Sequence, residues 1–127
     1  MFKATCHCGN VQLEASEKPD VVLSCNCSIC GRYGAIWAYY TEKQVSVTVQ
    51  AEPTKTYRWG DETTDFHHCP RCGCMTHYNR RPHVERQIVA VNTRMASRED
   101  MDGIPVAMFD GAESWDFVED HPGWGGF

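Results

Sequence analysis

Eight cysteines in three short clusters constrain the fold of this 127-residue chain more than any other feature. The clusters are Cys6 and Cys8, then Cys25, Cys27 and Cys30, and finally Cys69 and Cys72, with Cys74 just beyond. Thiolates are strong zinc ligands, and such short spacings let one turn present several sulfurs to the same ion. The sequence therefore predicts two zinc ions, the second of which can have a coordination position left open for chemistry.

The composition fits a small domain in a reducing compartment. The chain has a net charge of −5 and no basic run, which argues against a nucleic-acid partner. It has no apolar stretch near the ~18 residues of a membrane span and no apolar leader, so we expect a cytoplasmic protein without a membrane partner. In that compartment dense cysteine favours metal ligation, with disulfides as the alternative. We expect residues 1–127 to form one domain with a loose tail over 120–127.

Short runs rich in apolar and β-branched residues recur along the chain, at a spacing typical of all-β folds. The predicted strands cover residues 11–15, 20–25, 35–41, 44–50, 54–59, 64–68, 75–79, 86–93, 105–109 and 114–119. A single short helix is expected near Ser97 to Met101, capped by Ser97 and ended by Gly103. The pattern predicts an all-β sandwich or barrel-like domain with at most one short helix.

The third cluster resembles a zinc knuckle, because the turn Cys69-Pro70-Arg71-Cys72-Gly73 can present two sulfurs at once. The partner half is expected to be Cys6 and Cys8, which would face the same side of a strand at positions i and i+2. These four thiolates would form a closed structural zinc site that ties the N-terminus to the middle of the chain. Four buried free thiols are the alternative.

The second cluster offers only three ligands from one loop, Cys25, Cys27 and Cys30. If water or substrate takes the fourth position the site can be catalytic, and if a protein group takes it the site is structural. Three thiolates leave the zinc site with a net negative charge, which suits binding an incoming thiol better than activating water. Cys74 is a possible fourth ligand, and His77 is a further candidate.

Several segments resemble the glutathione-dependent formaldehyde-activating enzyme family over about residues 1–115. They are Cys6-His7-Cys8-Gly9, Cys25 to Arg32, Phe66 to Gly73, Val91 to Arg94, Gly103 to Val106 and Phe109 to Gly111. The resemblance implies a β-tent fold, in which two antiparallel sheets are pinned by zinc. It also implies a structural zinc on Cys6, Cys8, Cys69 and Cys72, and an active-site zinc on Cys25, Cys27 and Cys30.

The activity that this resemblance implies is carbon–sulfur lyase chemistry on S-hydroxymethylglutathione or a related thiol adduct. Glutathione would place its sulfur on the second zinc, with Tyr33, Tyr39 or a water molecule as the candidate proton donor. Arg32 and Arg94 are the candidate contacts for the glutathione carboxylates, together with Arg80. Solvated or structural ion pairs are the alternative for each arginine.

Two other interpretations stay open from the sequence. A non-enzymatic zinc-stabilised binding module would have both metal sites closed, and a thiol redox enzyme would use Cys74 as its reactive residue. Trp37, Tyr39 and Tyr40 are candidates to line a pocket, with an apolar strand face as the alternative. The true thiol substrate and the oligomeric state are not specified by these motifs.

Overall fold

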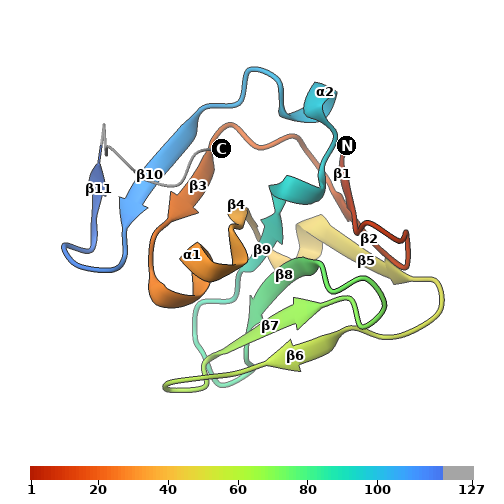
Figure 1. Cartoon of the computed structure of the whole chain (residues 1–127), viewed down its shortest axis with the longest axis horizontal. Helices are drawn as coiled ribbons and strands as arrows, with labels where there is room; N and C mark the ends of the chain where they lie inside the picture. Colours follow the sequence, from red (N-terminus) through yellow and green to blue (C-terminus); the bar gives the residue numbers. More distant parts are fainter. Residues whose placement is uncertain (119–127) are drawn as a thin grey trace.

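The computed structural model describes residues 1–118 and contains mostly β-strands (Figure 1). Its elements are β1 (Phe2–Thr5), β2 (Val11–Ala15), β3 (Val22–Cys25), α1 (Ser28–Tyr33), β4 (Ile36–Tyr40), η1 (Glu42–Gln44), β5 (Val45–Val49), β6 (Lys55–Tyr57), β7 (Thr64–His68), β8 (Met75–Arg80), β9 (Val89–Asn92), η2 (Thr93–Met95), α2 (Arg98–Met101), β10 (Val106–Asp110) and β11 (Asp116–Val118). Within these residues no helix is long and apolar enough to cross a bilayer. The predicted all-β class is confirmed.

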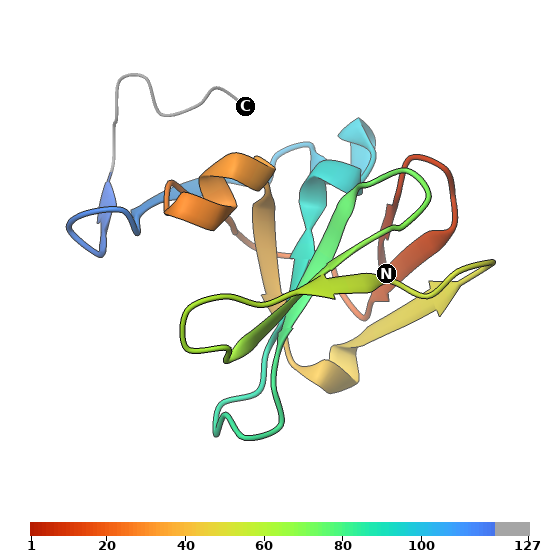
Figure 2. The same ribbon diagram turned by 60° about the horizontal axis from the view of Figure 1, so that its bottom comes forward.

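The strands form two sheets. The small sheet has the order β1-β2-β5, and the large sheet has the order β11-β10-β3-β4-β9-β8-β7-β6. The small sheet lies at one end of the molecule and the β10–β11 hairpin at the other (Figures 1 and 2). All pairings are antiparallel except β3 with β10, which run parallel in the register Val22↔Val106 to Cys25↔Phe109. The large sheet is therefore mixed through this one pair, whereas the family resemblance implied two antiparallel sheets.

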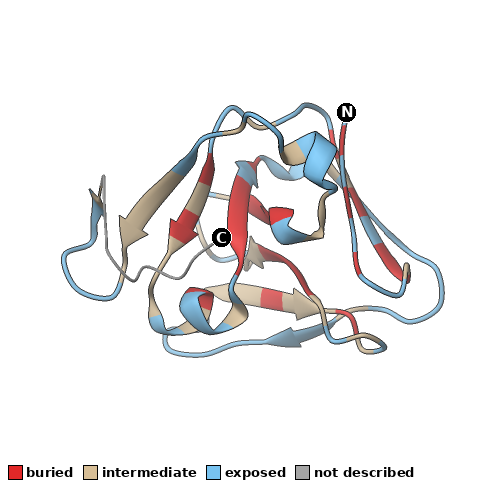
Figure 3. Ribbon diagram, turned by 45° about the horizontal axis from the view of Figure 1, so that its top comes forward, coloured by how far each residue is buried: buried red, intermediate tan, exposed pale blue. Residues whose placement is uncertain are grey.

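The two faces of the central strands support two separate cores. On β4 the side chains of Ile36 and Ala38 belong to one cluster of buried residues, whereas Trp37 between them belongs to the other. On β9 the same alternation separates Val91 from Ala90. Successive side chains of a strand point to opposite faces, so the two cores lie on opposite faces of the β4–β9 pair. The buried residues concentrate on these strands and on β1, β2 and β8 (Figure 3).

The first core connects the small sheet to the large one. Its members include Phe2, Ala4 and Leu13 from β1 and β2, together with Cys6 and Cys69. The strands β1 and β2 alternate buried and exposed residues, as expected for a sheet with one covered face. The second core contains Cys30, with Cys25 and Cys27 packed against it. The cysteine clusters thus belong to different cores.

The expectation of at most one short helix is wrong, because two short α-helices form. The helix α2 lies where it was predicted, with the Ser97 side chain accepting from the Asp100 amide. The other helix, α1, occupies the segment that was interpreted as a turn between cysteines. Its sequence contains Gly31 and has no helical apolar period, but Cys27 caps its first turn and Gly34 ends it at a φ of 65°.

Most predicted strands have a counterpart within a few residues of their bounds. The strand β1 was not predicted, because four residues with Lys3 among them give too short a pattern. The last predicted strand corresponds to β11, and its end at residue 119 lies outside the described residues, as does the tail expected over 120–127.

Candidate metal centres and the adjoining cavity

The sulfurs of Cys6, Cys8, Cys69 and Cys72 lie within 4.8 Å of one another. The Cys8 sulfur is 3.7 Å from that of Cys6 and 3.7 Å from that of Cys69. A tetrahedral zinc with Zn–S bonds of about 2.3 Å requires sulfur–sulfur edges of about 3.8 Å. The spacing of this group therefore fits one tetrahedral ion with four thiolate ligands.

Two tight turns build this first cluster. Cys6 and Cys8 were expected on a strand, but they lie in the turn between β1 and β2, where the Gly9 amide donates to the Cys6 carbonyl at 3.0 Å. Cys69 and Cys72 lie in the turn between β7 and β8, where the Gly73 amide donates to the Cys69 carbonyl at 2.9 Å. Both glycines have a positive φ, of 83° and 80°, which a residue with a Cβ rarely adopts.

Nitrogen donors surround the sulfurs of the first cluster. The Val11 amide donates to the Cys6 sulfur at 3.2 Å, and the buried Asn10 side-chain amide donates to the Cys69 sulfur at 3.5 Å. The side-chain Oδ1 of Asn10 in turn accepts hydrogen bonds from the backbone amides of Ala51 and Glu52. Such donors stabilise the thiolate form of a cysteine. The sequence analysis missed Asn10, whose only sequence signal was its place after a Cys-x-Cys-Gly turn.

The sulfurs of Cys25, Cys27 and Cys30 form a second group within 4.8 Å of one another. Cys25 ends β3, Cys27 is the N-cap of α1 and Cys30 lies in its first turns. The Cys30 amide donates to the Cys27 sulfur at 3.4 Å, and the Trp37 indole nitrogen donates to the Cys30 sulfur at 3.4 Å. Hydrogen bonds from the neighbouring Cys25 and Cys30 thiols hold the pKa of Cys27 down at about 2. One member of this group is therefore prepared to be a thiolate.

Within residues 1–118, no other cysteine, histidine or carboxylate joins this second group. The chemistry of both donor sets fits zinc, since soft thiolates in fours and threes are its usual protein ligands. Two cysteine clusters that could each hold a metal ion are thus present in the folded chain.

The structure places Cys74 and His77 away from the second group. The Cys74 carbonyl accepts the Cys69 amide at 2.9 Å, and burial beside the Cys72 thiol raises the pKa of Cys74. Cys74 thus lies next to the first cluster, and its role as fourth ligand of the second gains no support from this geometry. The buried His77 ring stacks on His67 at 4.1 Å and contacts the Thr76 hydroxyl.

A turn from the opposite end of the chain closes over the second cluster. The Asn26 side-chain amide donates to Asp110 at 2.9 Å, and its carbonyl oxygen accepts the Ala112 amide at 3.0 Å. These bonds bring Gly111 so close that a Cβ there would lie 2.6 Å from the Cys25 sulfur. Only glycine fits this position without displacing the sulfur. In the sequence, the Asp110-Gly111 dipeptide indicates a turn, but no pattern indicates that this turn contacts the cysteines.

Two adjoining cavities meet at the second cluster. Their volumes are about 630 Å³ and about 450 Å³, within the range usual for small-molecule sites. Both are lined by Cys27, Cys30, Tyr78, Arg80 and Trp115. We call the larger one the aromatic lobe, since Tyr39, Phe109 and Phe117 also line it together with Arg86. The smaller one, the loop lobe, is lined in addition by Trp59, Asp61, Thr63 and Phe66.

Only some of the aromatic residues singled out in the sequence line these lobes. Tyr39 lines the aromatic lobe. Trp37 is fully buried and donates to the Cys30 sulfur, and the Tyr40 hydroxyl donates to the Glu17 carbonyl at 3.0 Å. Burial raises the pKa of Tyr39, and raises that of Tyr78 to about 12. Both phenols therefore keep their protons at neutral pH. Tyr78, which the sequence analysis missed, contributes to both lobes.

The arginines divide in the same way. Arg32 donates to the Ser28 carbonyl at 2.8 Å and lines a separate hollow beside α1, together with Tyr33. Arg94 donates to the Gly34 carbonyl at 3.0 Å. The cations that line the lobes are instead Arg80, which was the third candidate, and Arg86, which was not considered. The contacts predicted for Arg32 and Arg94 thus gain no support from their positions.

Comparison with known proteins agrees with this arrangement. Residues 1–108 match the model of the family described as glutathione-dependent formaldehyde-activating enzyme. The chain belongs to this family. It is also similar to a crystal structure of a Rhodobacter sphaeroides protein, with 32% identity and a TM-score of 0.65, over 83% of this chain and 99% of the other. No curated protein matches the chain.

Membership confirms the resemblance that the cysteine spacing had indicated. It places the chain among proteins named for glutathione-dependent formaldehyde activation, and the two cysteine clusters are compatible with zinc.

Proposed function

We propose that this protein is a zinc-dependent carbon–sulfur lyase that interconverts glutathione and formaldehyde with S-hydroxymethylglutathione. The observation that carries the proposal is the contrast between a group of four thiols, anchored in one core by the buried Cys6 and Cys69, and a group of three that lines two cavities. Cys6, Cys8, Cys69 and Cys72 would hold a structural zinc, and Cys25, Cys27 and Cys30 a second zinc.

A zinc ion held by three thiolates would supply one thing to the reaction, a lower pKa for an incoming thiol. The chain supplies the rest. The two lobes receive the arms of the substrate on either side of Cys27 and Cys30, and aromatic side chains line both lobes. Arg80 and Arg86 are the cations available to carboxylates of the substrate.

The bond changes are simple. The glutathione thiol loses its proton to solvent, its sulfur forms a bond to the formaldehyde carbon, and the π-electron pair moves to the carbonyl oxygen. That oxygen takes up a proton from a side chain, which then regains one from solvent. Tyr78, with a pKa of about 12, and Tyr39 beside it can donate that proton and recover it in the reverse direction. In the cleavage direction the carbon–sulfur bond breaks and the hydroxyl proton returns to the tyrosine.

The direct test follows adduct formation by NMR in mixtures of zinc-loaded protein, glutathione and formaldehyde. We expect the wild-type protein to accelerate formation above the protein-free rate, and Cys27→Ser to lose the acceleration. Cys74→Ser is the matched control, because it removes a thiol that lies outside both groups. A wild-type rate equal to the protein-free rate overturns the enzymatic proposal.

The sulfur count separates this proposal from a binding module with two closed sites. X-ray absorption at the zinc edge of Cys74→Ser is expected to give the same average sulfur number as the wild-type protein, below four per ion. An average of four that falls in the variant would mean that Cys74 closes the second site, as the module requires.

The eight cysteines are all free thiols in this structure. Free thiols at this density support a reducing, cytoplasmic location, which we include in the proposal.

A further inference from the structure

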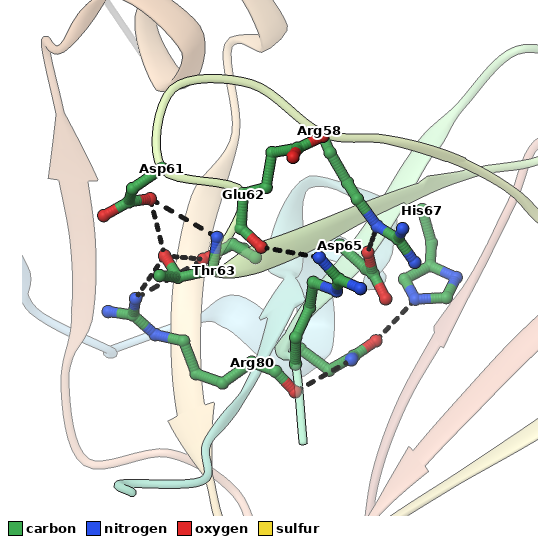
Figure 4. Close-up of polar contacts among 10 residues, drawn as sticks. Arg58, Asp61, Glu62, Thr63, Asp65, His67 and Arg80 are labelled. Atoms are coloured by element: carbon green, nitrogen blue, oxygen red, sulfur yellow. Dashed lines mark hydrogen bonds and ion pairs between the residues drawn. The ribbon is translucent and has the colours of Figure 1, made fainter. Parts of the chain in front are cut away.

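The loop lobe carries two opposite charges on either side of one hydroxyl group. The Thr63 hydroxyl donates to the Asp61 carboxylate at 2.9 Å, and an Arg80 guanidinium nitrogen donates to the same hydroxyl oxygen at 3.4 Å (Figure 4). A second hydroxyl, on Thr64, accepts from Arg80 at 3.4 Å. Asp61, Thr63 and Arg80 all line the cavity that also contains Cys27 and Cys30.

Neither charge is neutralised by a neighbouring side chain. Within residues 1–118, the ion pairs are Lys3 with Glu14 and Arg58 with Asp65, so Asp61 and Arg80 each face the lobe without an oppositely charged partner. One Asp61 oxygen is occupied by the Thr63 amide and hydroxyl, which leaves the other free to accept. Arg80 has further guanidinium donors beyond the nitrogen that contacts the threonines.

The Asp61 carboxylate and the Arg80 guanidinium do not bind each other, because the Thr63 hydroxyl lies between them and contacts both. They are nevertheless close enough for one small ligand group to contact both. An α-amino acid head group carries an ammonium and a carboxylate on the same carbon, and this is the arrangement that would fill such a site. The ammonium would donate to Asp61, and the carboxylate would accept from Arg80.

We propose that Asp61 and Arg80 form a receptor for the zwitterionic head of the γ-glutamyl arm of the thiol substrate. The inference rests on the proposed function, because it assumes a thiol whose sulfur lies at Cys27 and Cys30. It assigns an orientation as well as a substrate class. The γ-glutamyl arm enters the loop lobe, which leaves the aromatic lobe, with Arg86 at its wall, for the carboxylate of the other arm.

Two glutathione analogues test the two halves of this receptor separately. Glutaryl-cysteinyl-glycine lacks only the α-amino group, and 4-aminobutanoyl-cysteinyl-glycine lacks only the α-carboxylate. Binding of each thiol to the zinc-loaded protein is measured by calorimetry without formaldehyde, so the readout does not depend on catalysis. Each analogue is expected to bind the wild-type protein about tenfold or more weakly than glutathione, since each loses a charge-assisted hydrogen bond.

Variants then assign each loss to a residue. Asp61→Asn is expected to bind glutathione and the glutaryl analogue about equally while still discriminating against the 4-aminobutanoyl analogue. Arg80→Gln is expected to give the reverse pattern. The matched controls are Glu62→Gln and Arg81→Gln, which remove the same charges from neighbouring positions and are expected to keep both preferences. Zinc content and thermal unfolding establish that each variant is folded, and the analogue series on the wild-type protein needs no variant.

The outcomes separate the inference from the proposed function. If glutathione binds but the wild-type protein does not distinguish the three thiols, or if the control variants change selectivity as much as Asp61→Asn and Arg80→Gln, the receptor is wrong and the enzyme proposal stands. If selectivity follows the expected pattern but no adduct formation is accelerated, the receptor stands and the enzyme proposal is wrong. If glutathione does not bind, both are wrong.

Discussion

The two cysteine clusters lie on opposite faces of the same central strands and differ in what surrounds them. The first cluster belongs to the core that joins the two sheets, with Cys6 and Cys69 buried. The second packs against the other core through Cys30 but opens onto two cavities. Four protein sulfurs can complete the coordination shell of a zinc ion, so such a set can contribute to folding but leaves no position for substrate, even where one of its sulfurs, that of Cys8, is exposed. Three sulfurs beside a cavity leave one coordination position to which a substrate has access.

The largest expected difference between the clusters is their effect on folding. Cys69→Ser removes a fully buried ligand of the group that joins β1 and β2 to the rest of the molecule, and is expected to destabilise the protein by several kcal/mol. Cys27→Ser is expected to lose metal from the second cluster and leave a folded protein. Metal content by mass spectrometry and thermal denaturation distinguish the two variants. Equal destabilisation by both substitutions would contradict the proposal that the first cluster is structural and the second functional.

Gly111→Ala is expected to affect the second cluster alone. Its Cβ would lie 2.6 Å from the Cys25 sulfur, so that ligand must shift, and the affinity of the second metal ion is expected to fall about tenfold or more. Gly31→Ala is the matched control, because its Cβ would make only an ordinary contact of 3.5 Å with the Asn26 carbonyl. Competition with a chelator measures both affinities. Retention of full affinity in Gly111→Ala would contradict the tight contact between this turn and the cluster.

A smaller effect on metal affinity is expected from substitution of Trp37, whose indole nitrogen contacts the second cluster. Trp37→Phe removes the donor to the Cys30 sulfur while keeping an aromatic ring in the core. We expect the affinity of the second ion to fall several-fold and that of the first to stay unchanged, since Asn10 and Val11 supply its donors. The same chelator competition, read separately for the two ions, checks this. An equal loss at both ions would mean that the variant acts through general unfolding.

The last expected effect concerns the stability of the whole fold and not the affinity of either metal ion, and it is a dependence on pH. Burial lowers the pKa of His77 to about 3, so the unfolded chain binds a proton below about pH 6.5 that the folded chain does not. The free energy of unfolding is then highest above pH 6.5 and falls by at most about 1.4 kcal/mol per pH unit as the pH decreases toward 3. Chemical denaturation between pH 7 and 5 measures the slope.

His77→Gln is the control for this pH dependence. It is expected to flatten the slope relative to the wild-type protein while the acid titration of the remaining groups continues in both. Identical slopes would show that His77 is not held neutral by the fold.

The sequence allowed the class of fold and the grouping of cysteines to be predicted, because strand periodicity and ligand spacing are local patterns. Val45 to Val49, for example, form the strand β5 that their alternating sequence predicts, although Val47 and Val49 are exposed where the alternation predicted a covered face. The cavity could not be predicted in the same way. Its walls come from Asp61, Arg80, Arg86 and Trp115, which no local pattern connects, and which meet only because the sheet order places β7, β8 and the β10–β11 hairpin around α1.

The errors have the same origin. The helix α1 depends on Cys27 as a cap, and the parallel pairing of β3 with β10 joins segments more than 80 residues apart. The substrate contacts proposed for Arg32 and Arg94 stay predictions. Both side chains donate to backbone carbonyls, those of Ser28 and Gly34, whereas the arginines that line the larger cavity come from β8 and the loop that follows it.

The placement of the clusters on opposite sides of Trp37, Ala38, Ala90 and Val91 also limits chemical damage. Thiol exchange proceeds only when one sulfur can attack another directly. Because the sheet separates the two groups of sulfurs, a mixed disulfide formed at one cluster cannot be passed directly to the other.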